Sequence, residues 1–224
     1  MRLSVIIPIL NEARQLPDLF AHLLPLRRGG HEIIFADGGS TDGSAALVEV
    51  AGFRLVRAGR GRALQMNAGA AAASGEALLF LHADTRLPPG APHHILQALA
   101  DGDRCWGRFD VCIVGRPFML KVVAAAMNAR SRWTGIATGD QAMFMRREIF
   151  LRLGGFPAQP LMEDVEISKR LKKISPPACL HQCVNTSGRR WETRGVWRTI
   201  FLMWRLRWEY WRGIDAGLLA EQYQ

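Results

Sequence analysis

An imidazole and a carboxylate, His82 and Asp84, stand on alternate positions at the end of an apolar run. In an extended strand, residues two apart point to the same face, so both side chains would reach one ligand beyond the strand end. A hard divalent cation that also binds phosphate oxygens needs only one or two protein carboxylates. Because a lone Asp after a strand is more often a turn residue, the stretch alone favours a strand end and leaves a metal site open.

Two loops place polar side chains just after buried strands. The first contains Asn11 and Glu12, and the second begins at Asp37. Such side chains can accept the imide proton of a uracil or bind ribose hydroxyls, while the glycines after Asp37 let the backbone approach a ligand. The alternative is structural, since Asp42 could cap the next helix and Asp37 could anchor a turn. Each loop alone supports both interpretations equally.

Three arginines, Arg57, Arg60 and Arg62, precede an alanine-rich helix. The free backbone donors and the dipole at a helix N-terminus favour an anion, and Gly61 allows a close approach. The segment is not a P-loop, because no GxxxxGK pattern precedes the helix. A solvated basic loop is the alternative.

A further group of acidic residues, Glu163, Asp164 and Glu166, opens a helix that follows Pro160. Acidic residues in a first turn are the ordinary complement of the helix dipole. A carboxylate at that position that points into a cleft could instead take a proton from a hydroxyl nucleophile.

The C-terminal segment is rich in Trp and Arg, and Arg198, Arg205 and Arg212 recur every seven residues. This spacing predicts a narrow basic stripe on an otherwise apolar helix. Such a helix could lie in a membrane interface, bind a lipid-linked substrate or pack against a partner. A core-packing helix with arginines at its edge is the alternative.

The elements that position these residues follow from apolar periodicity and from the Gly and Pro residues between them. We expect strands at 3–8, 31–36, 53–57 and 77–82, with helices at 16–26, 41–50 and 62–73 between them. The second half predicts a helix at 92–100, a strand at 109–114, a helix at 118–130 and a strand at 142–145. Alternating strands and helices predict an α/β fold with a mostly parallel sheet, whose ligands bind at the carboxyl ends of the strands.

Composition limits the class of protein. The chain is 49% hydrophobic, which excludes a disordered or collagen-like protein. No apolar run reaches the roughly 20 residues of a membrane span, and the N-terminus lacks a secretory signal pattern, so we expect a cytoplasmic protein. The four cysteines would then be reduced thiols. Cys179 and Cys183 would lie roughly 13 Å apart along one strand, too far to share a metal ion.

The net charge of +9 comes mainly from arginine, because the chain contains four lysines. The planar guanidinium group suits phosphate and carboxylate partners. Nucleic acid, an anionic membrane surface and phosphorylated small molecules all fit this charge, so charge alone does not choose among them.

Five motifs in order resemble the inverting family 2 glycosyltransferases: SVIIPILNE, DGGSTDGS, LLFLHADTRLP, GDQAMFMRREIFLRLGGFP and LMEDVEISKRL. The resemblance covers about residues 3–173 and looks closest to a small bacterial soluble-type subfamily. It implies the nucleotide-diphospho-sugar transferase (GT-A) fold. We therefore expect a catalytic domain over 1–190, with a nucleotide-binding half at about 1–90 and an acceptor half at about 91–190. A Trp/Arg-rich amphipathic helical tail would follow over 191–224.

The resemblance also implies site roles. The residues implied at the donor nucleotide sugar are Pro8, Asn11, Glu12, Asp37, Arg62 and Asp84, with Arg190 and Trp191 covering the donor or the acceptor. Asp84 looks like the last residue of the family's DXD motif, which holds Mg²⁺ or Mn²⁺. His82 could be a further metal ligand, a phosphate contact or a hydrogen-bond donor to a metal ligand. Asp164 looks like the general base, with Glu163 beside it. The acceptor would contact Asp140, Gln141, Gly155 and Phe156.

Two departures from the family pattern matter. His82 replaces the first carboxylate of DXD, so the metal site loses one charge and would either bind metal more weakly or prefer Mn²⁺, which accepts imidazole more readily than Mg²⁺. The stretch SGRRW matches only the end of the longer motif of processive synthases, which favours transfer of a single sugar.

These observations predict transfer of one sugar from a nucleotide-diphosphate sugar to a hydroxyl that a lipid could carry, with no nucleic acid partner. A nucleotidyltransferase of similar fold and a non-catalytic membrane- or protein-binding module are the alternatives. A peripheral contact at the inner face of a membrane and a homodimer contact through the C-terminal helix both stay open.

Overall fold

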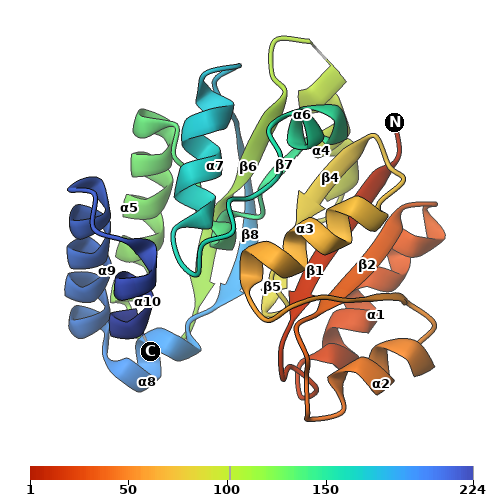
Figure 1. The fold of residues 1–224 in the computed structure, drawn as a ribbon, viewed down its shortest axis with the longest axis horizontal. Coiled ribbons are helices and arrows are strands. Elements are labelled where there is room, and N and C mark those ends of the chain that lie inside the picture. Colours follow the sequence, from red (N-terminus) through yellow and green to blue (C-terminus); the bar gives the residue numbers. More distant parts are fainter. Residues whose placement is uncertain (101, 224) are drawn as a thin grey trace.

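The protein forms an eight-stranded sheet flanked by helices, as seen in a computed structural model that describes residues 1–100 and 102–223 (Figure 1). The strands are β1 (Leu3–Ile9), β2 (Glu32–Asp37), β3 (Arg54–Arg57), β4 (Ala77–Phe80), β5 (Thr85–Arg86), β6 (Trp106–Val114), β7 (Phe144–Arg146) and β8 (Ala178–Ser187). The helices are α1 (Leu16–Arg28), α2 (Ser44–Val50), α3 (Arg62–Ala72), α4 (Ala91–Ala100), α5 (Met119–Thr134), α6 (Arg147–Arg152), α7 (Glu163–Lys172), α8 (Arg189–Arg194), α9 (Val196–Trp211) and α10 (Ala216–Tyr223). A 3-10 turn, η1, covers Gly139–Gln141.

The sheet order is β3-β2-β1-β4-β7-β6-β8-β5. The first four strands in this order run parallel to their neighbours. β7 then pairs antiparallel with both β4 and β6, while β6 and β8 are parallel and β5 is antiparallel to β8. The α/β class with a mostly parallel sheet is therefore confirmed, and the antiparallel β7 joins the two halves of the chain.

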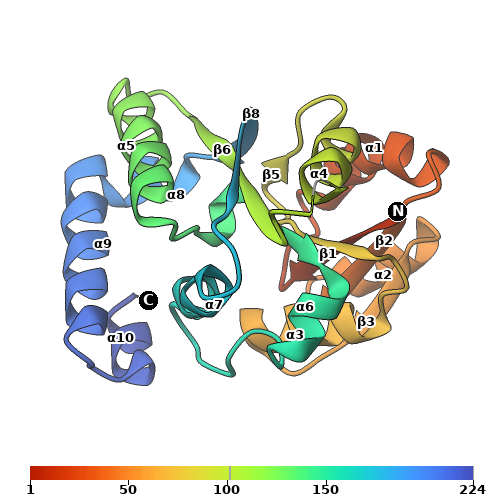
Figure 2. The same ribbon diagram turned by 90° about the horizontal axis from the view of Figure 1, so that it is seen from above.

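β1 is buried on both faces, which explains why it is apolar throughout. Leu3 and Val5 join a core cluster with residues of α1, α4 and α5, whereas Ile6 points to the opposite side and packs in the cluster of α3, α6 and α7. The two helical layers on either side of the sheet are visible from above (Figure 2). A methyl group on Gly69 would lie 2.5 Å from the Ile6 side chain, so this glycine lets α3 pack closely on β1 and fixes the position of Arg62 at its start.

The predicted strand at 77–82 is too long, since β4 ends at Phe80. Beyond it the chain turns, and the Thr85 N–H donates to the His82 carbonyl at 3.1 Å. His82 and Asp84 therefore lie in a turn and do not share a strand face. The turn leads into β5, where Thr85 pairs with Thr186 of β8 and brings the segment after β8 beside Asp84.

β8 contains an irregularity that the sequence pattern did not show. Leu180 pairs with Phe109 and Cys183 with Asp110, so His181 and Gln182 form a bulge in the ladder. The regular strand alternation assumed for Cys179 and Cys183 is therefore wrong. All four cysteines are free thiols, as expected, and only Cys105 is fully buried.

The C-terminal helices pack beside α7 and α5 at one side of the molecule (Figures 1 and 2). Leu206 of α9 and Leu219 of α10 are fully buried in a small cluster with Leu161 and Met162, which precede α7. Within the described residues, no helix has the combined length and apolar character needed to cross a membrane.

Candidate active site

A cavity of about 500 Å³ opens at the carboxyl ends of β1 and β4. Its walls come from segments far apart in the sequence: the loop after β1, the start of α3, the turn after β4, η1, the start of α7, the end of β8, and α8 to α10. Of the predicted site residues, Pro8, Glu12, Arg62, His82, Asp84, Asp140, Glu163, Asp164, Arg190 and Trp191 line it. The volume suits a small-molecule ligand.

Gln65 lines the cavity and links the ends of two strands; it is 4% exposed. Its amide nitrogen donates to the carbonyls of Ile9 at 2.7 Å and Ala36 at 2.9 Å, at the ends of β1 and β2. Glu12 also lines the cavity. Burial, followed by the charge of Asp84, raises the pKa of the Glu12 carboxyl. The Glu12 and Asp84 carboxylates are therefore close enough for their charges to repel each other.

Asn11 and Asp37, predicted at the nucleoside, lie outside the cavity lining. The Asn11 side-chain oxygen accepts the Thr41 N–H at 2.9 Å, and Asp37 accepts the N–H groups of Gly39 and Ser40. Asp42 accepts the Ala13 N–H and so ties the two loops together. In this structure both predicted residues therefore stabilise the loops that follow β1 and β2, and their nucleoside contacts stay predictions.

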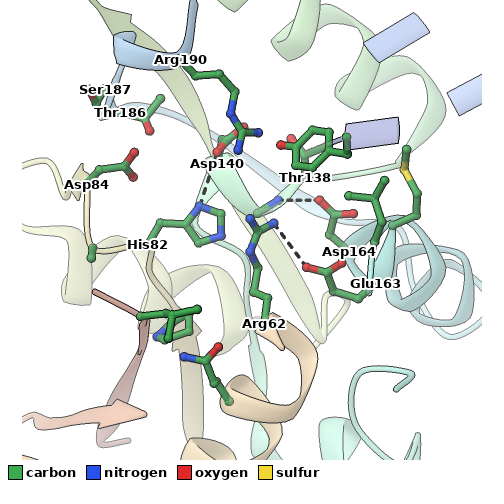
Figure 3. Close-up of a pocket in the computed structure, with 18 of the residues that line it drawn as sticks. Arg62, His82, Asp84, Thr138, Asp140, Glu163, Asp164, Thr186, Ser187 and Arg190 are labelled. Carbon is green, nitrogen blue, oxygen red and sulfur yellow. Dashed lines mark hydrogen bonds and ion pairs between the residues drawn. The ribbon is translucent and has the colours of Figure 1, made fainter. Parts of the chain in front are cut away.

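His82 and Asp140 face each other in the cavity, and Asp84 lies to one side of this pair (Figure 3). Nδ1 of His82 lies 3.4 Å from Oδ1 of Asp140, whereas the Nε2 atom is buried without a hydrogen-bond partner among the described residues. A methyl group on Gly139 would lie 2.6 Å from that Nε2 atom and from Cε1, so this edge of the ring packs against the glycine. Burial raises the pKa of the Asp140 carboxyl, but the hydrogen bond from His82 and the charges of His82, Arg62 and Arg190 outweigh it and lower the pKa to about 2.

Arginines surround these carboxylates. Arg62 rises from the start of α3 between Asp140 and Glu163, and its Nη1 lies 3.4 Å from Oε1 of Glu163 (Figure 3). Burial acts to lower the pKa of Arg62, but Glu163, Asp164, Asp140 and Asp84 together raise it. Arg190 enters from the opposite wall and its guanidinium lies 4.3 Å from the ring centre of Tyr223. Arg60, Arg189 and Arg207 also line the cavity.

Glu163 and Asp164 begin α7 after Met162, whose φ of 64° turns the chain sharply into the helix. Glu163 is 2% exposed, and burial, followed by the charge of Asp164, raises the pKa of its carboxyl. Asp164 is more accessible and accepts the N–H groups of Gly139 at 2.9 Å and Val165 at 2.7 Å. These bonds fix the Asp164 carboxylate at the cavity wall and leave lone pairs free for a ligand.

Three residues predicted at the acceptor lie outside the lining of this cavity: Gln141, Gly155 and Phe156. Gln141 is fully buried and accepts the Thr138 N–H. Phe156 is buried near Glu163. The side-chain amide of Asn67 donates to the Phe156 carbonyl and accepts the Phe156 N–H. Their acceptor roles stay predictions.

The structure adds lining residues that the motifs did not indicate. Thr138 carries a buried hydroxyl with no hydrogen-bond partner among the described residues. Met203, Leu206 and Arg207 of α9 and Tyr223 of α10 close the far wall, so the lining crosses the predicted domain boundary at residue 190. A basic, aromatic helix gives no sequence signal for a cavity wall, because only docking decides which side faces inward.

Comparison with known proteins identifies the class. The model of the family described as Glycosyl transferase family 2 matches residues 4–154, and the chain belongs to this family. It is 24% identical to the probable glycosyltransferase YdaM of Bacillus subtilis over 236 aligned positions, which cover 95% of this chain and 55% of that protein. The chain therefore spans about half the length of this curated relative.

Solved structures show the same fold. S. aureus TarS in complex with UDP-GlcNAc superposes with a TM-score of 0.66 at 17% identity, covering 84% of this chain and 58% of that one. The mannosyltransferase PcManGT from Pyrobaculum calidifontis, in complex with GDP-Man and Mn2+, gives a TM-score of 0.67 at 22% identity, covering 92% of this chain and 60% of that one. The predicted nucleotide-diphospho-sugar transferase (GT-A) fold is confirmed.

Proposed function

We propose that this protein transfers one sugar from a nucleotide-diphosphate sugar to an acceptor hydroxyl, with inversion and with the help of a divalent metal ion. One observation carries the proposal. A single cavity holds a carboxylate at a strand end, Asp84, several arginines suited to a diphosphate, and a second carboxylate, Asp164, at a helix start. The TarS and PcManGT complexes, which contain UDP-GlcNAc and GDP-Man, support a donor of this class.

The donor would lie along the N-terminal side of the cavity. Pro8 and Glu12 would border the nucleoside, and Arg62, Arg189 and Arg190 would face the diphosphate. Guanidinium groups bind phosphate oxygens with paired, charge-assisted hydrogen bonds. The buried Thr138 hydroxyl, which lacks a partner among the described residues, would donate to a donor oxygen.

The protein side chains available as metal ligands fit a site in which the substrate supplies the remaining ligands. Among the described residues, no group of three or more His, Cys, Asp and Glu side chains could hold an ion. Asp84 would therefore supply a protein carboxylate, and diphosphate oxygens and water would complete the shell, as hard divalent cations accept. When bound, the ion would offset the negative charge that develops on the leaving diphosphate. PcManGT, solved with Mn2+, supports a metal of this kind.

His82 would orient the Asp140 carboxylate. Its Nδ1 faces Asp140 and its Nε2 is covered by Gly139, so the ring orients that carboxylate in the cavity. This arrangement favours a positioning role, because neither ring nitrogen faces open space.

Asp164 would remove the proton from the acceptor hydroxyl. Its two N–H contacts hold the carboxylate in one orientation, and its spare lone pairs can accept the hydroxyl hydrogen. Attack on the anomeric carbon from the face opposite the diphosphate forms one C–O bond as another breaks, so the product has inverted configuration. Glu163, whose Oε1 faces Arg62, would hold the diphosphate-side arginine in place.

The proposal is tested by thermal-shift measurements with UDP, GDP, UDP-glucose and GDP-mannose, each with Mn²⁺, Mg²⁺ or a chelator. A ligand that binds only the folded protein raises its Tm. We expect a metal-dependent rise with at least one of these compounds, followed by release of the nucleoside diphosphate from the corresponding sugar donor. Pyrophosphate release from UTP or GTP would instead identify a nucleotidyltransferase. Absence of any nucleotide-dependent shift would favour the non-catalytic alternative.

A further inference from the structure

α9 is apolar on two opposite sides. One side packs inward, where Leu206, with Leu202 and Met203 beside it, is buried against the segment before α7 and against α10. The other side carries five aromatic residues that are exposed by 55–79%: Trp197, Phe201, Trp204, Trp208 and Trp211. Figures 1 and 2 show α9 at the outer edge of the molecule. We name this exposed row the aromatic face.

The five residues lie on one line. Their intervals of four, three, four and three place them within a narrow band along the helix. Aromatic side chains each offer about 150–250 Å² of surface, so the exposed part of the row amounts to on the order of 600 Å². A patch of that size is at the upper end of what soluble monomers expose, and larger apolar patches usually mark an interaction surface.

A row of arginines runs along one edge of the aromatic face. Arg198, Arg205 and Arg212 are exposed and lie about 60–100° around the helix from the aromatic row. The Arg212 guanidinium lies 4.7 Å from the ring centre of Trp208. The acidic residue of α9, Glu209, is paired with Arg205, with 2.7 Å between Oε1 and Nε. The edge therefore keeps a positive charge.

We propose that the aromatic face and its arginine row bind the interface of an anionic phospholipid bilayer, with α9 lying in the plane of the membrane surface. Trp side chains favour the headgroup region, because the ring is apolar and the indole N–H needs a polar partner. Arginine stems can cover apolar surface while the guanidinium reaches phosphate. The buried opposite side of α9 keeps the helix attached to the protein, which suits a surface-bound arrangement.

The charge beside the aromatic face favours an anionic bilayer over a second copy of the chain as its partner. The four-three spacing would also suit a helix pair, but such pairs place aliphatic residues along the seam and opposite charges beside it. Two aromatic faces in contact would bring arginine rows together with only the already paired Glu209 to balance them. An anionic surface complements the row instead.

The same helix forms a wall of the cavity through Met203, Leu206 and Arg207. The cavity therefore lies about one helix diameter, roughly 10 Å, behind the proposed membrane surface. A consequence that rests on the proposed function is that the acceptor would be presented at the bilayer.

Vesicle sedimentation tests the proposal. We expect the protein to bind vesicles of phosphatidylcholine with phosphatidylglycerol, with a blue shift of Trp emission, and to bind phosphatidylcholine alone at least tenfold more weakly. Replacing Trp204, Trp208 and Trp211 by alanine, or Arg198, Arg205 and Arg212 by glutamine, should each weaken binding to the anionic vesicles at least tenfold. Because the Trp side chains are exposed, the Tm of the Trp variant should change little. The Arg variant should stay folded with a modestly lower Tm, since Arg205→Gln removes the partner of the 14%-exposed Glu209.

Matched controls use exposed residues on other elements. Leu47→Ser with Val50→Ser on α2 removes exposed apolar surface, and Arg28→Gln with Arg57→Gln and Arg152→Gln removes three charges. Both controls should bind as the parent does. Equal losses in controls and test variants, no binding of the parent to anionic vesicles, or a dimer that the Trp variant dissociates would each overturn the proposal. Nucleotide-induced Tm shifts should persist in the Trp variant. Vesicle binding therefore tests the membrane proposal, and the Tm shifts test the proposed function separately.

Discussion

Asp164→Asn tests the proposed base with the smallest change of shape. In the parent protein one Asp164 oxygen accepts the Gly139 N–H at 2.9 Å and the other accepts the Val165 N–H at 2.7 Å. The asparagine amide keeps one of these bonds, but its NH₂ group must face the other N–H donor. An unsatisfied donor costs about 1–3 kcal/mol, and each kcal/mol lowers the Tm of a chain of this size by about 2–4 °C. The variant should therefore fold with a modestly lower Tm.

Activity should fall much further. General base catalysis contributes about a hundredfold to ten-thousandfold, so the rate of nucleoside diphosphate release during sugar transfer should drop within that range. Donor binding, measured as the nucleotide-induced Tm shift, should remain. Glu166→Gln is the matched control, because Glu166 lies two residues along the same helix and outside the cavity lining, and it should keep the parent rate. A folded Asp164→Asn protein that retains more than a tenth of the parent rate would refute the base assignment.

Three other predictions concern the metal, the docking of α9 and the Cys183 thiol. Asp84→Asn should reduce the Mn²⁺-dependent part of the UDP-induced Tm shift at least tenfold in apparent affinity, and an undiminished shift would remove Asp84 from the metal site. Leu206→Ala should lower the free energy of unfolding by about 2–5 kcal/mol in denaturant titrations, because the side chain is fully buried, whereas Leu218→Ala, 57% exposed, should change it little; equal effects would contradict the packing of α9. Burial, followed by the neighbouring Cys112 thiol, raises the pKa of Cys183 to about 12 from 9.0, so its thiolate fraction at pH 8 should be at least a hundredfold below that of an unperturbed thiol. Mass spectrometry of iodoacetamide-treated protein should show slow labelling of Cys183 that accelerates as pH rises, and rapid labelling of the folded protein at pH 8 would be inconsistent with this environment.

The alternation of strands and helices in the first half of the chain was predictable, because it depends on local sequence patterns. The apolar run of β1, the helical spacing of α1 and the glycines between elements each specify one segment. β7 was harder, because its short apolar segment is compatible with several partners. Its antiparallel place between β4 and β6 is set by contacts over long sequence distances.

The candidate site shows the same division. Asp84, Asp164 and Arg62 were named from motifs, and the fold brings them to one cavity. Asn11 and Asp37 were named on equally good local grounds, and the fold shows them outside the cavity lining, where they accept loop N–H groups. A carboxylate or amide after a strand can bind a ligand or a nearby N–H, and the sequence pattern is identical in both cases.

The sequence alone determined the α/β class, the family resemblance and the residue types available for a diphosphate, a metal and a base, because periodicity and motif order are properties of the chain itself. Tertiary structure decided which of those residues share a cavity. It ended β4 before His82, paired β5 with β8 so that Thr186 lies beside Thr85, and turned Arg207 of α9 inward while five aromatic residues face outward. Helix α9 has apolar residues on two sides, so only its packing against α10 and the segment before α7 determined which side is buried.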